Sequence, residues 1–308
     1  MRFAILIPSA EGKQPGGNPL APDVFDYRTS DTFNYFNVLN PERRKLIDAL
    51  QYQLRNSKNA EKLFALKDEN LQEAIDVNLE VYDSPLMAAI ERYSKGVLYQ
   101  AMDFEGLPTG AQRRLLENGI IFSGMFGLLR PDDLIPNYRL KMDVTVEEVG
   151  KVSKYWRPII SDILNKLLTG KVVWNLLPSS FEEAWEDAQT YDIMYRLKFF
   201  KEEKGELQPV THGVKELRGH LIHFIATSLA DDPEALIEWD SPEGYEPDME
   251  ASELGEQGGT IMMVSRPGWQ KRRKARKAAK EAEEAERRAR REEAAAEEES
   301  DDSDDQED

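Results

Sequence analysis

Short apolar runs alternate with amphipathic segments along most of the chain. The runs at residues 3–7, 120–122, 171–178 and 260–264 show little alternation, which is typical of strands buried on both faces. Elsewhere apolar residues recur at helical spacing, which predicts helices over residues 42–54, 63–76, 85–93, 109–116, 152–168, 179–188 and 213–229. The pattern as a whole predicts an α/β (mixed α+β) fold, a single large domain with a central mixed sheet flanked by helices.

Other segments have weaker patterns. Residues 94–100 predict a short strand or turn, and residues 193–200 and 207–211 predict a β-hairpin with its turn at Lys204-Gly205. Residues 19–40 and 231–259 are polar without a clear period. They predict irregular surface segments.

The end of the chain has a different composition. From Gln270 onward the only apolar side chains are alanines, so this segment is neither a coiled coil nor a core helix. Its Ala, Glu, Lys and Arg residues favour a solvated helix, supported by pairs four residues apart: Glu283–Arg287, Glu284–Arg288 and Glu286–Arg290. Like-charge repulsion predicts disorder over residues 297–308. The sequence thus predicts a folded domain at 1–266 and a charged helical or disordered tail at 267–308.

Composition narrows the class of protein. With 308 residues and 40% hydrophobic residues, the chain can form a globular domain with a large core. No apolar window is long enough for a membrane span, and the N-terminal apolar run is too short for a signal peptide. We therefore expect a soluble, cytoplasmic protein without a membrane partner. The lack of cysteine excludes disulfides, thiolate nucleophiles and cysteine-bound metal.

The charge balance limits how the protein can bind nucleic acid. The formal net charge is −18, and the tail from Gln270 has 11 basic and 15 acidic residues, which leaves 29 basic and 43 acidic residues in the rest. A body this acidic does not attract polyphosphate as a whole. Binding of nucleic acid must therefore use a local basic cleft and must weaken with salt.

The most constrained segment runs from Ile120 to Asp143. Its apolar start is followed by glycines, and two prolines lie between Arg130 and Arg139. Glycine permits positive φ or close backbone approach, and proline fixes the path of the chain. The segment predicts either a buried strand that delivers a rigid, arginine-bearing loop or an ordinary connection.

A second candidate follows the first strand. The loop at residues 8–17 is rich in glycine and contains Lys13, but a Walker phosphate loop would need a glycine in place of Ile7 and Ser or Thr in place of Gln14. Lys13 is either a site residue at the end of a strand or a solvated turn lysine.

Polar residues follow the ends of several apolar runs. If the strands are parallel neighbours, their carboxyl ends converge on one crevice. Basic residues there would bind a phosphate or a nucleic-acid backbone, and glycines would let the backbone approach it. The candidates for this binding are Lys13, Gly124, Gly127, Arg130, Arg139, Lys215 and Arg218. The candidates for polar or acid–base roles are Ser123, Asp133 and Asn175.

The histidines do not form a recognisable metal-binding pattern. His220 and His223 could share a helical face, with His212 nearby, but no set of carboxylates accompanies them. We expect neither a bound metal nor a cofactor.

One long motif resembles a known family. The segment from Ser123 to Met142 is similar to the signature of the YaaA peroxide stress proteins. The matching residues are Ser123, Gly124, Phe126, Gly127, Arg130, Pro131, Asp133, Leu134, Tyr138, Arg139, Leu140 and Met142. Agreement extends to Ser9, Glu11, Gly12, Lys13, Trp156, Asn175, Leu176, Lys215, Arg218, Gly219, Gly244 and Tyr245. The resemblance covers about residues 1–266 and leaves out the tail.

The resemblance implies a mixed α/β domain around a basic cleft. It also implies a role in limiting free iron and oxidative damage under peroxide stress. It further implies binding of double-stranded or distorted DNA through a helix-hairpin-helix-like element, which we expect around residues 115–134. The alternative is an enzyme that acts on a nucleotide or nucleobase in the same crevice. Direct iron sequestration has little support, because no ligand set is recognisable.

Overall fold

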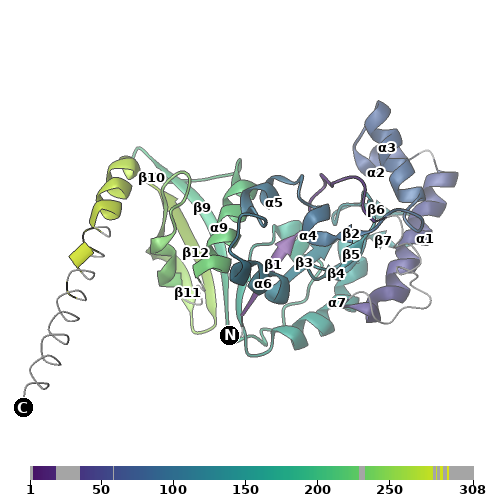
Figure 1. Ribbon diagram of the computed structural model, residues 1–308. Helices are drawn as coiled ribbons and strands as arrows, with labels where there is room; N and C mark the ends of the chain where they lie inside the picture. Colours follow the sequence, from purple (N-terminus) through teal and green to yellow (C-terminus); the bar gives the residue numbers. More distant parts are fainter. Residues whose placement is uncertain are drawn as a thin grey trace, which may run out of the picture.

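A twisted central sheet runs through the molecule (Figure 1). The computed structural model describes residues 3–18, 35–57, 59–228 and 233–279, with 282, 285, 286 and 290 beyond them. Three predictions lie outside these residues. They are most of the segment expected to be irregular (residues 19–34 of 19–40), the pairs Glu283–Arg287 and Glu284–Arg288, and the disorder expected at 297–308.

The sheet has eight strands in the order β11-β12-β9-β8-β1-β3-β4, with β10 paired to β9. The five neighbouring strands β12, β9, β8, β1 and β3 are parallel to one another. Three strands pair antiparallel: β4 with β3, β10 with β9, and β11 with β12. The bounds are β1 (Phe3–Pro8), β3 (Gly119–Ser123), β4 (Gly127–Leu129), β8 (Val172–Asn175), β9 (Ile193–Glu203), β10 (Glu206–Pro209), β11 (Tyr245–Gly255) and β12 (Gly258–Ser265). The prediction of a mixed sheet is confirmed.

The helices differ in length from the predicted ones. Their bounds are α1 (Asn40–Asn56), α2 (Ala60–Phe64), α3 (Asp68–Leu79), α4 (Ala89–Arg92), α5 (Val97–Met102), α6 (Thr109–Asn118), α7 (Val152–Leu168), α8 (Ser179–Glu182) and α9 (Val214–Ser228), with 3-10 turns η2 (Asn37–Leu39) and η3 (Pro233–Glu238). Two short ladders pair β2 (Met87–Ala88) with β5 (Leu134–Ile135) and β6 (Thr145–Val146) with β7 (Gly150–Lys151).

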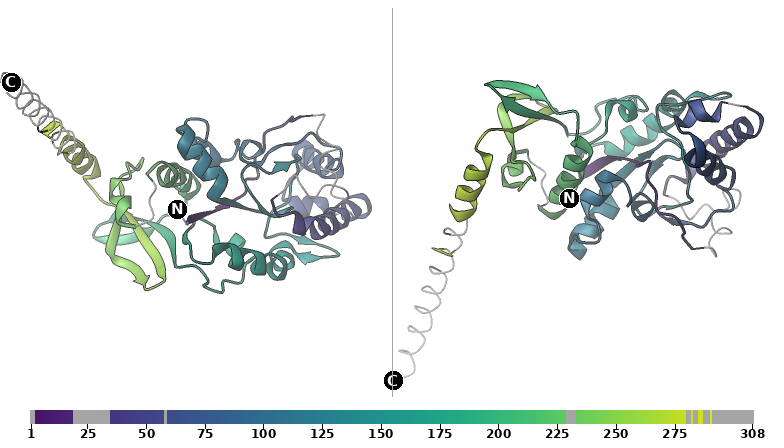
Figure 2. Two further views of the ribbon diagram at one scale, coloured as in Figure 1. Left: turned by 60° about the horizontal axis from the view of Figure 1, so that its bottom comes forward. Right: turned by 90° about the horizontal axis from the view of Figure 1, so that it is seen from above.

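Helices cover both faces of the sheet. Helices α5, α6 and α9 lie on one face and α7 on the other (Figure 2, left). Because β1 is covered on both sides, all six of its residues are buried, which explains its apolar sequence. Helices α5 and α9 approach closely at Gly219, where a Cβ atom would lie only 2.1 Å from the carbonyl oxygen of Leu98. This contact places α9 beside the start of α5.

Several element predictions were wrong. Residues 97–102 form α5 instead of a strand or turn, because the segment is too short for its period to be read. The helix expected at 85–93 is limited to α4, since Met87–Ala88 pairs with β5. The helix expected at 179–188 ends at Glu182. The polar segment 231–259 contains β11, an edge strand whose exposed side chains hide its pattern.

The expected helix-hairpin-helix-like element is absent from residues 115–134. This part of the chain forms the end of α6, then β3, a tight turn and β4, which pairs antiparallel with β3. The apolar residues of 120–122 enter the sheet, where they are buried. The segment is thus a strand hairpin of the core.

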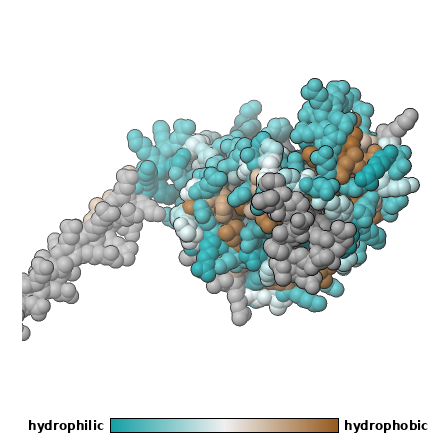
Figure 3. Space-filling view, turned by 45° about the vertical axis from the view of Figure 1, so that its right-hand side comes forward, coloured by the Kyte–Doolittle hydropathy of each residue, from teal (hydrophilic) through white to brown (hydrophobic). Residues whose placement is uncertain are grey.

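The charged composition agrees with the visible surface. The face that includes α1 is mostly hydrophilic, with small and separate hydrophobic areas (Figure 3). Beyond the sheet, residues 269–279 are helical, which confirms the helical prediction for the described start of the tail. The pair Glu286–Arg290 is present at 2.6 Å.

Candidate functional site

A cavity of about 500 Å³ lies at the carboxyl ends of β1 and β8. We call it the basic crevice. Its walls come from the loop after β1, the start of α5, residues 139–143, the segment after β8 and one side of α9. A side cavity of about 230 Å³ shares Glu11, Lys13 and Arg139 with it. Another hollow of about 610 Å³ lies between α1 and Glu148, away from every residue singled out from the sequence.

The crevice is lined by more basic than acidic side chains. The basic residues are Lys13, Lys95, Arg139, Lys141, Lys215 and Arg218, and the acidic residues are Glu11 and Asp143. Glu11 pairs with Arg139 at 3.5 Å and with Lys141 at 3.3 Å, so its single charge is shared between two cations. An excess of positive charge therefore remains, in a protein whose net charge is −18.

Two arginines of the crevice have unused donors. The Nε atoms of Arg139 and Arg218 are buried, and neither has a hydrogen-bond acceptor among the residues that the structure describes. Burial lowers the pKa of Arg218, and the charge of Glu182 opposes this effect. A buried donor without an acceptor is unfavourable in free energy, and a hydrogen bond to an anionic ligand would offset part of this cost.

Lys13 lies at the junction of the two cavities. Its Nζ donates to the carbonyl oxygen of Ala10 at 3.0 Å and lies 4.0 Å from the centre of the Tyr138 ring. Burial lowers the pKa of Lys13 from 10.5 to about 7, and the charge of Arg139 adds to this effect. Glu11 acts in the opposite direction, and Arg92 lowers the pKa further.

A chain of buried hydroxyl groups lies behind Lys13. The Tyr138 hydroxyl is 2.6 Å from that of Tyr93 and 2.8 Å from Oγ of Ser123. Oγ of Ser123 also accepts the backbone N–H of Phe126 at 3.0 Å. Burial raises the pKa of Tyr138 to about 12. Ser123 is fully buried and does not line the crevice, so Tyr138 separates it from a ligand.

Comparison with known proteins identifies relatives of this chain. The family model described as peroxide stress protein YaaA matches residues 3–251. The chain belongs to this family. A UPF0246 protein of Rickettsia bellii is 31% identical over 184 residues, which cover 58% of this chain and 71% of the relative. A UPF0246 protein of Streptomyces coelicolor is 28% identical over 190 residues (61% and 72%), and an uncharacterized protein of Campylobacter jejuni is 26% identical over 204 residues (66% and 78%).

The two glycines of the family signature serve packing. A Cβ atom on Gly124 would lie 2.5 Å from the carbonyl oxygen of Leu140, and Trp156 donates its indole N–H to the Gly124 carbonyl at 2.8 Å. Gly127 has φ +69°, and a Cβ atom there would lie 2.9 Å from the Trp156 ring. Both glycines are buried. Gly124 packs the β3–β4 turn against residues 140–141, Gly127 packs it against Trp156, and neither glycine lines the crevice.

Arg130 and Asp133 lie near the amino end of β3 and do not line the basic crevice. Because β4 runs antiparallel to β3, the chain returns from the crevice before it reaches Arg130. The Arg130 guanidinium contacts Asp132 at 3.0 Å and lies over the Tyr35 ring at 4.9 Å. Asp133 accepts the backbone N–H groups of Arg130 and Tyr35 at 2.8 and 2.9 Å. The structure therefore does not bring these two residues to Lys13.

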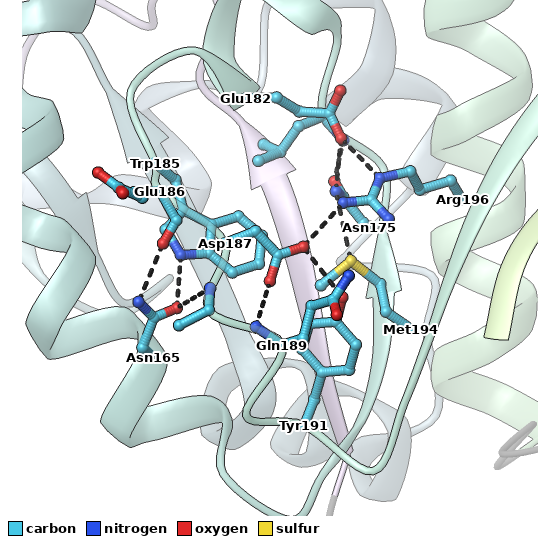
Figure 4. A network of polar contacts seen from close by, with 12 residues as sticks. Asn165, Asn175, Glu182, Trp185, Glu186, Asp187, Gln189, Tyr191, Met194 and Arg196 are labelled. Carbon is cyan, nitrogen blue, oxygen red and sulfur yellow. Dashed lines mark hydrogen bonds and ion pairs between the residues drawn. The ribbon is translucent and has the colours of Figure 1, made fainter. Parts of the chain in front are cut away.

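Asn175 lies at the end of β8, in a network that shapes the next loop (Figure 4). Its amide donates to Glu182 at 2.7 Å, and its carbonyl oxygen accepts the N–H of Leu177 at 3.0 Å. Arg196 of β9 also donates to Glu182 and reaches Asp187. The network holds the segment whose Pro178, Ser180 and Phe181 line the crevice. Asn175 is thus placed to position the wall.

Sequence reasoning missed four residues of this region. Lys95, Lys141, Tyr138 and Tyr93 line the crevice or support Lys13. Tyr138 matches the family signature and is adjacent to Arg139, so it could have been found. Lys95 depends on α5, which was not predicted, and no signal in the sequence marked it.

The described residues offer no group of three or more potential metal ligands. His223 lies on α9 and its Nδ1 is 2.9 Å from the carbonyl oxygen of Met102.

In the same described part of the chain, each helix is too short or too polar to cross a membrane.

Proposed function

We propose that this chain acts in the response to peroxide stress by binding DNA in the basic crevice, and that it thereby helps to limit iron-driven oxidative damage. Membership of the peroxide stress family supports the stress role. The observation that carries the binding role is the pair of buried, unused Nε donors of Arg139 and Arg218 in a cavity lined mainly by cations.

The charge distribution favours a local contact with phosphate. The net charge of −18 repels a polyanion, so only a concentrated basic site can hold one. Guanidinium groups match the geometry of phosphate oxygens and can bind them through two hydrogen bonds. Arg139, Arg218, Lys13 and Lys215 supply the charge in this crevice. Arg130 has a different position, where its guanidinium is engaged by the Leu116 carbonyl and by Asp132.

The proposal predicts a specific loss in Arg218→Ala. Affinity for a duplex should fall by about tenfold or more, because a charged hydrogen-bonding group is removed from phosphate. The slope of log affinity against log salt should decrease by about one. Fluorescence anisotropy of a labelled duplex over a range of salt concentrations measures both quantities.

Arg113→Ala is the matched control. Arg113 is exposed on α6, pairs only with Glu117 at 2.7 Å among the described residues, and its loss changes the net charge by the same amount. Affinity and salt slope should then stay close to those of the unmodified protein. Equal behaviour of Arg218→Ala and Arg113→Ala at low salt would contradict binding in the crevice.

A further inference from the structure

The amine of Lys13 is placed for covalent chemistry. Among the described residues, its nearest hydrogen-bond partner is the Ala10 carbonyl at 3.0 Å, and no carboxylate pairs with it within 4 Å. The Tyr138 ring lies on one side at 4.0 Å and the Tyr93 ring at 5.6 Å. Lys13 therefore faces two cavities, and none of the described carboxylates forms a direct ion pair with its amine.

The surroundings keep part of the amine neutral near physiological pH. Burial and the charge of Arg139 lower the pKa of Lys13 to about 7. A neutral amine has a free electron pair and attacks carbonyl carbon, as the lysines of imine-forming enzymes do. Arginine cannot replace it, because the guanidinium stays protonated.

The groups around the amine suit a substrate that carries phosphate. Arg139 and Arg218 line the same cavity, and the Nε donor of each is buried with no acceptor in the described part of the chain. The volume of about 500 Å³ fits a sugar with a phosphate attached. The face of Tyr138 can stabilise a cation at the position of Nζ, which is the position of a protonated imine.

We propose that Lys13 condenses with the aldehyde of a phosphorylated sugar, such as the open-chain deoxyribose of an abasic site in DNA. The choice of abasic DNA as the substrate rests on the DNA binding proposed above. The electron pair of Nζ attacks C1′, the carbonyl oxygen takes up a proton, and the carbinolamine then loses water to give an imine between Nζ and C1′. Water is the only by-product, so no oxidant or reductant is consumed.

Two sources can supply this aldehyde, and the experiment separates them. The full chain is incubated with a duplex that contains one abasic site, and cyanoborohydride is added to reduce any imine to a stable amine. A second arm replaces the duplex by free glyceraldehyde 3-phosphate. Mass spectrometry of the digested protein then locates the adduct.

The expected result is a protein–DNA adduct on the peptide that contains Lys13. The adduct should fall to background in Lys13→Arg, which keeps the charge but has no nucleophilic amine. Lys171→Arg is the matched control, because burial also lowers the pKa of Lys171, which lies just before β8 at the opposite end of that strand. It should keep the full yield. An adduct that maps to other lysines, or persists in Lys13→Arg, would overturn the proposal.

A binding assay separates this inference from the proposed function. A duplex with a tetrahydrofuran site has the shape of an abasic site but no aldehyde. Binding of this duplex without an adduct on abasic DNA would refute the imine and leave DNA binding in place. Absence of both would refute the two together. An adduct with the free phosphosugar alone would support the chemistry of Lys13 and place its substrate outside DNA.

Discussion

Lys13 shows how one residue acquires a property that its type does not have in water. Burial beside Arg139 and Arg92 disfavours the charged amine, and Glu11 only partly offsets this. Tyr93 and Tyr138 also face the amine, but burial raises the pKa of both phenols, so they stay neutral around pH 7. Lys13 is therefore the group at this position whose charge changes near neutral pH.

A pH profile tests this property. The initial rate of adduct formation on abasic DNA should increase as the pH rises through about 7, since the neutral amine is the reactive form. In Glu11→Gln the carboxylate that raises the pKa is lost, so the profile should shift to lower pH. Trapping rates measured over a pH series give both midpoints. A midpoint close to that of an ordinary lysine, or a shift to higher pH in the variant, would contradict this account.

At the scale of elements, the β3–β4 hairpin sets the position of the crevice wall. Buried Arg43 donates to the carbonyl oxygens of Phe126 and Leu128 at 2.9 and 2.7 Å, which fixes the turn. Gly124 then allows residues 140–141 to approach. The family signature is in this sense a scaffold, and its Tyr138 and Arg139 are the parts that reach the site.

Gly127→Ala tests the scaffold. Gly127 has φ +69°, and a Cβ atom there would press on the Trp156 ring. We expect a loss of about 1–2 kcal/mol from backbone strain and a further loss of about 1–3 kcal/mol from overpacking. Thermal or urea denaturation measures the free energy of unfolding.

Gly150→Ala is the control for this substitution. Gly150 also has positive φ (+84°), but no heavy atom lies within 4 Å of its Cβ position. The free energy of unfolding of Gly150→Ala should therefore fall only by the amount due to backbone strain. Equal costs at both glycines would mean that Trp156 moves aside easily, which would contradict a rigid scaffold.

The sequence predicted the elements whose side chains are buried on a regular period. Strand β1 and helix α7 were found because their patterns are long or fully apolar. Strand β11 was missed because it is an exposed edge strand, and α5 because it has only six residues. Arg130 and Arg139 were grouped by sequence, but the antiparallel strand β4 carries the chain away from the carboxyl end of β3 just before Arg130. Such a reversal depends on pairing between strands, which a local pattern does not show.

On the scale of the whole molecule, an acidic body surrounds a basic crevice. The chain has 58 acidic and 40 basic residues, and this excess of negative charge repels polyanions from most of the surface. The crevice therefore has to gather its cations from distant segments: the loop after β1, residues 139–141 and α9. This arrangement favours contact at one place over non-specific coating of DNA.

The tail contacts the body through the basic block at residues 271–277. Arg272 and Arg276 pair with Glu246 at 3.8 and 3.2 Å, and Arg273 pairs with Asp240. These arginines are partly neutralised by the body and are less available to DNA. The segment from Gln270 has 11 basic and 15 acidic residues, so it adds net negative charge to the protein.

Deletion of residues 270–308 should therefore strengthen DNA binding at low salt, because the net charge changes from −18 to −14. The gain should disappear at high salt, where the Debye length is short. Arg272→Ala combined with Arg276→Ala is the control, since it removes the contacts to Glu246 and keeps the acidic residues. This variant should not show the gain. Weaker binding after the deletion would instead indicate that the basic block contacts DNA directly, and anisotropy titrations at two salt concentrations distinguish the two outcomes.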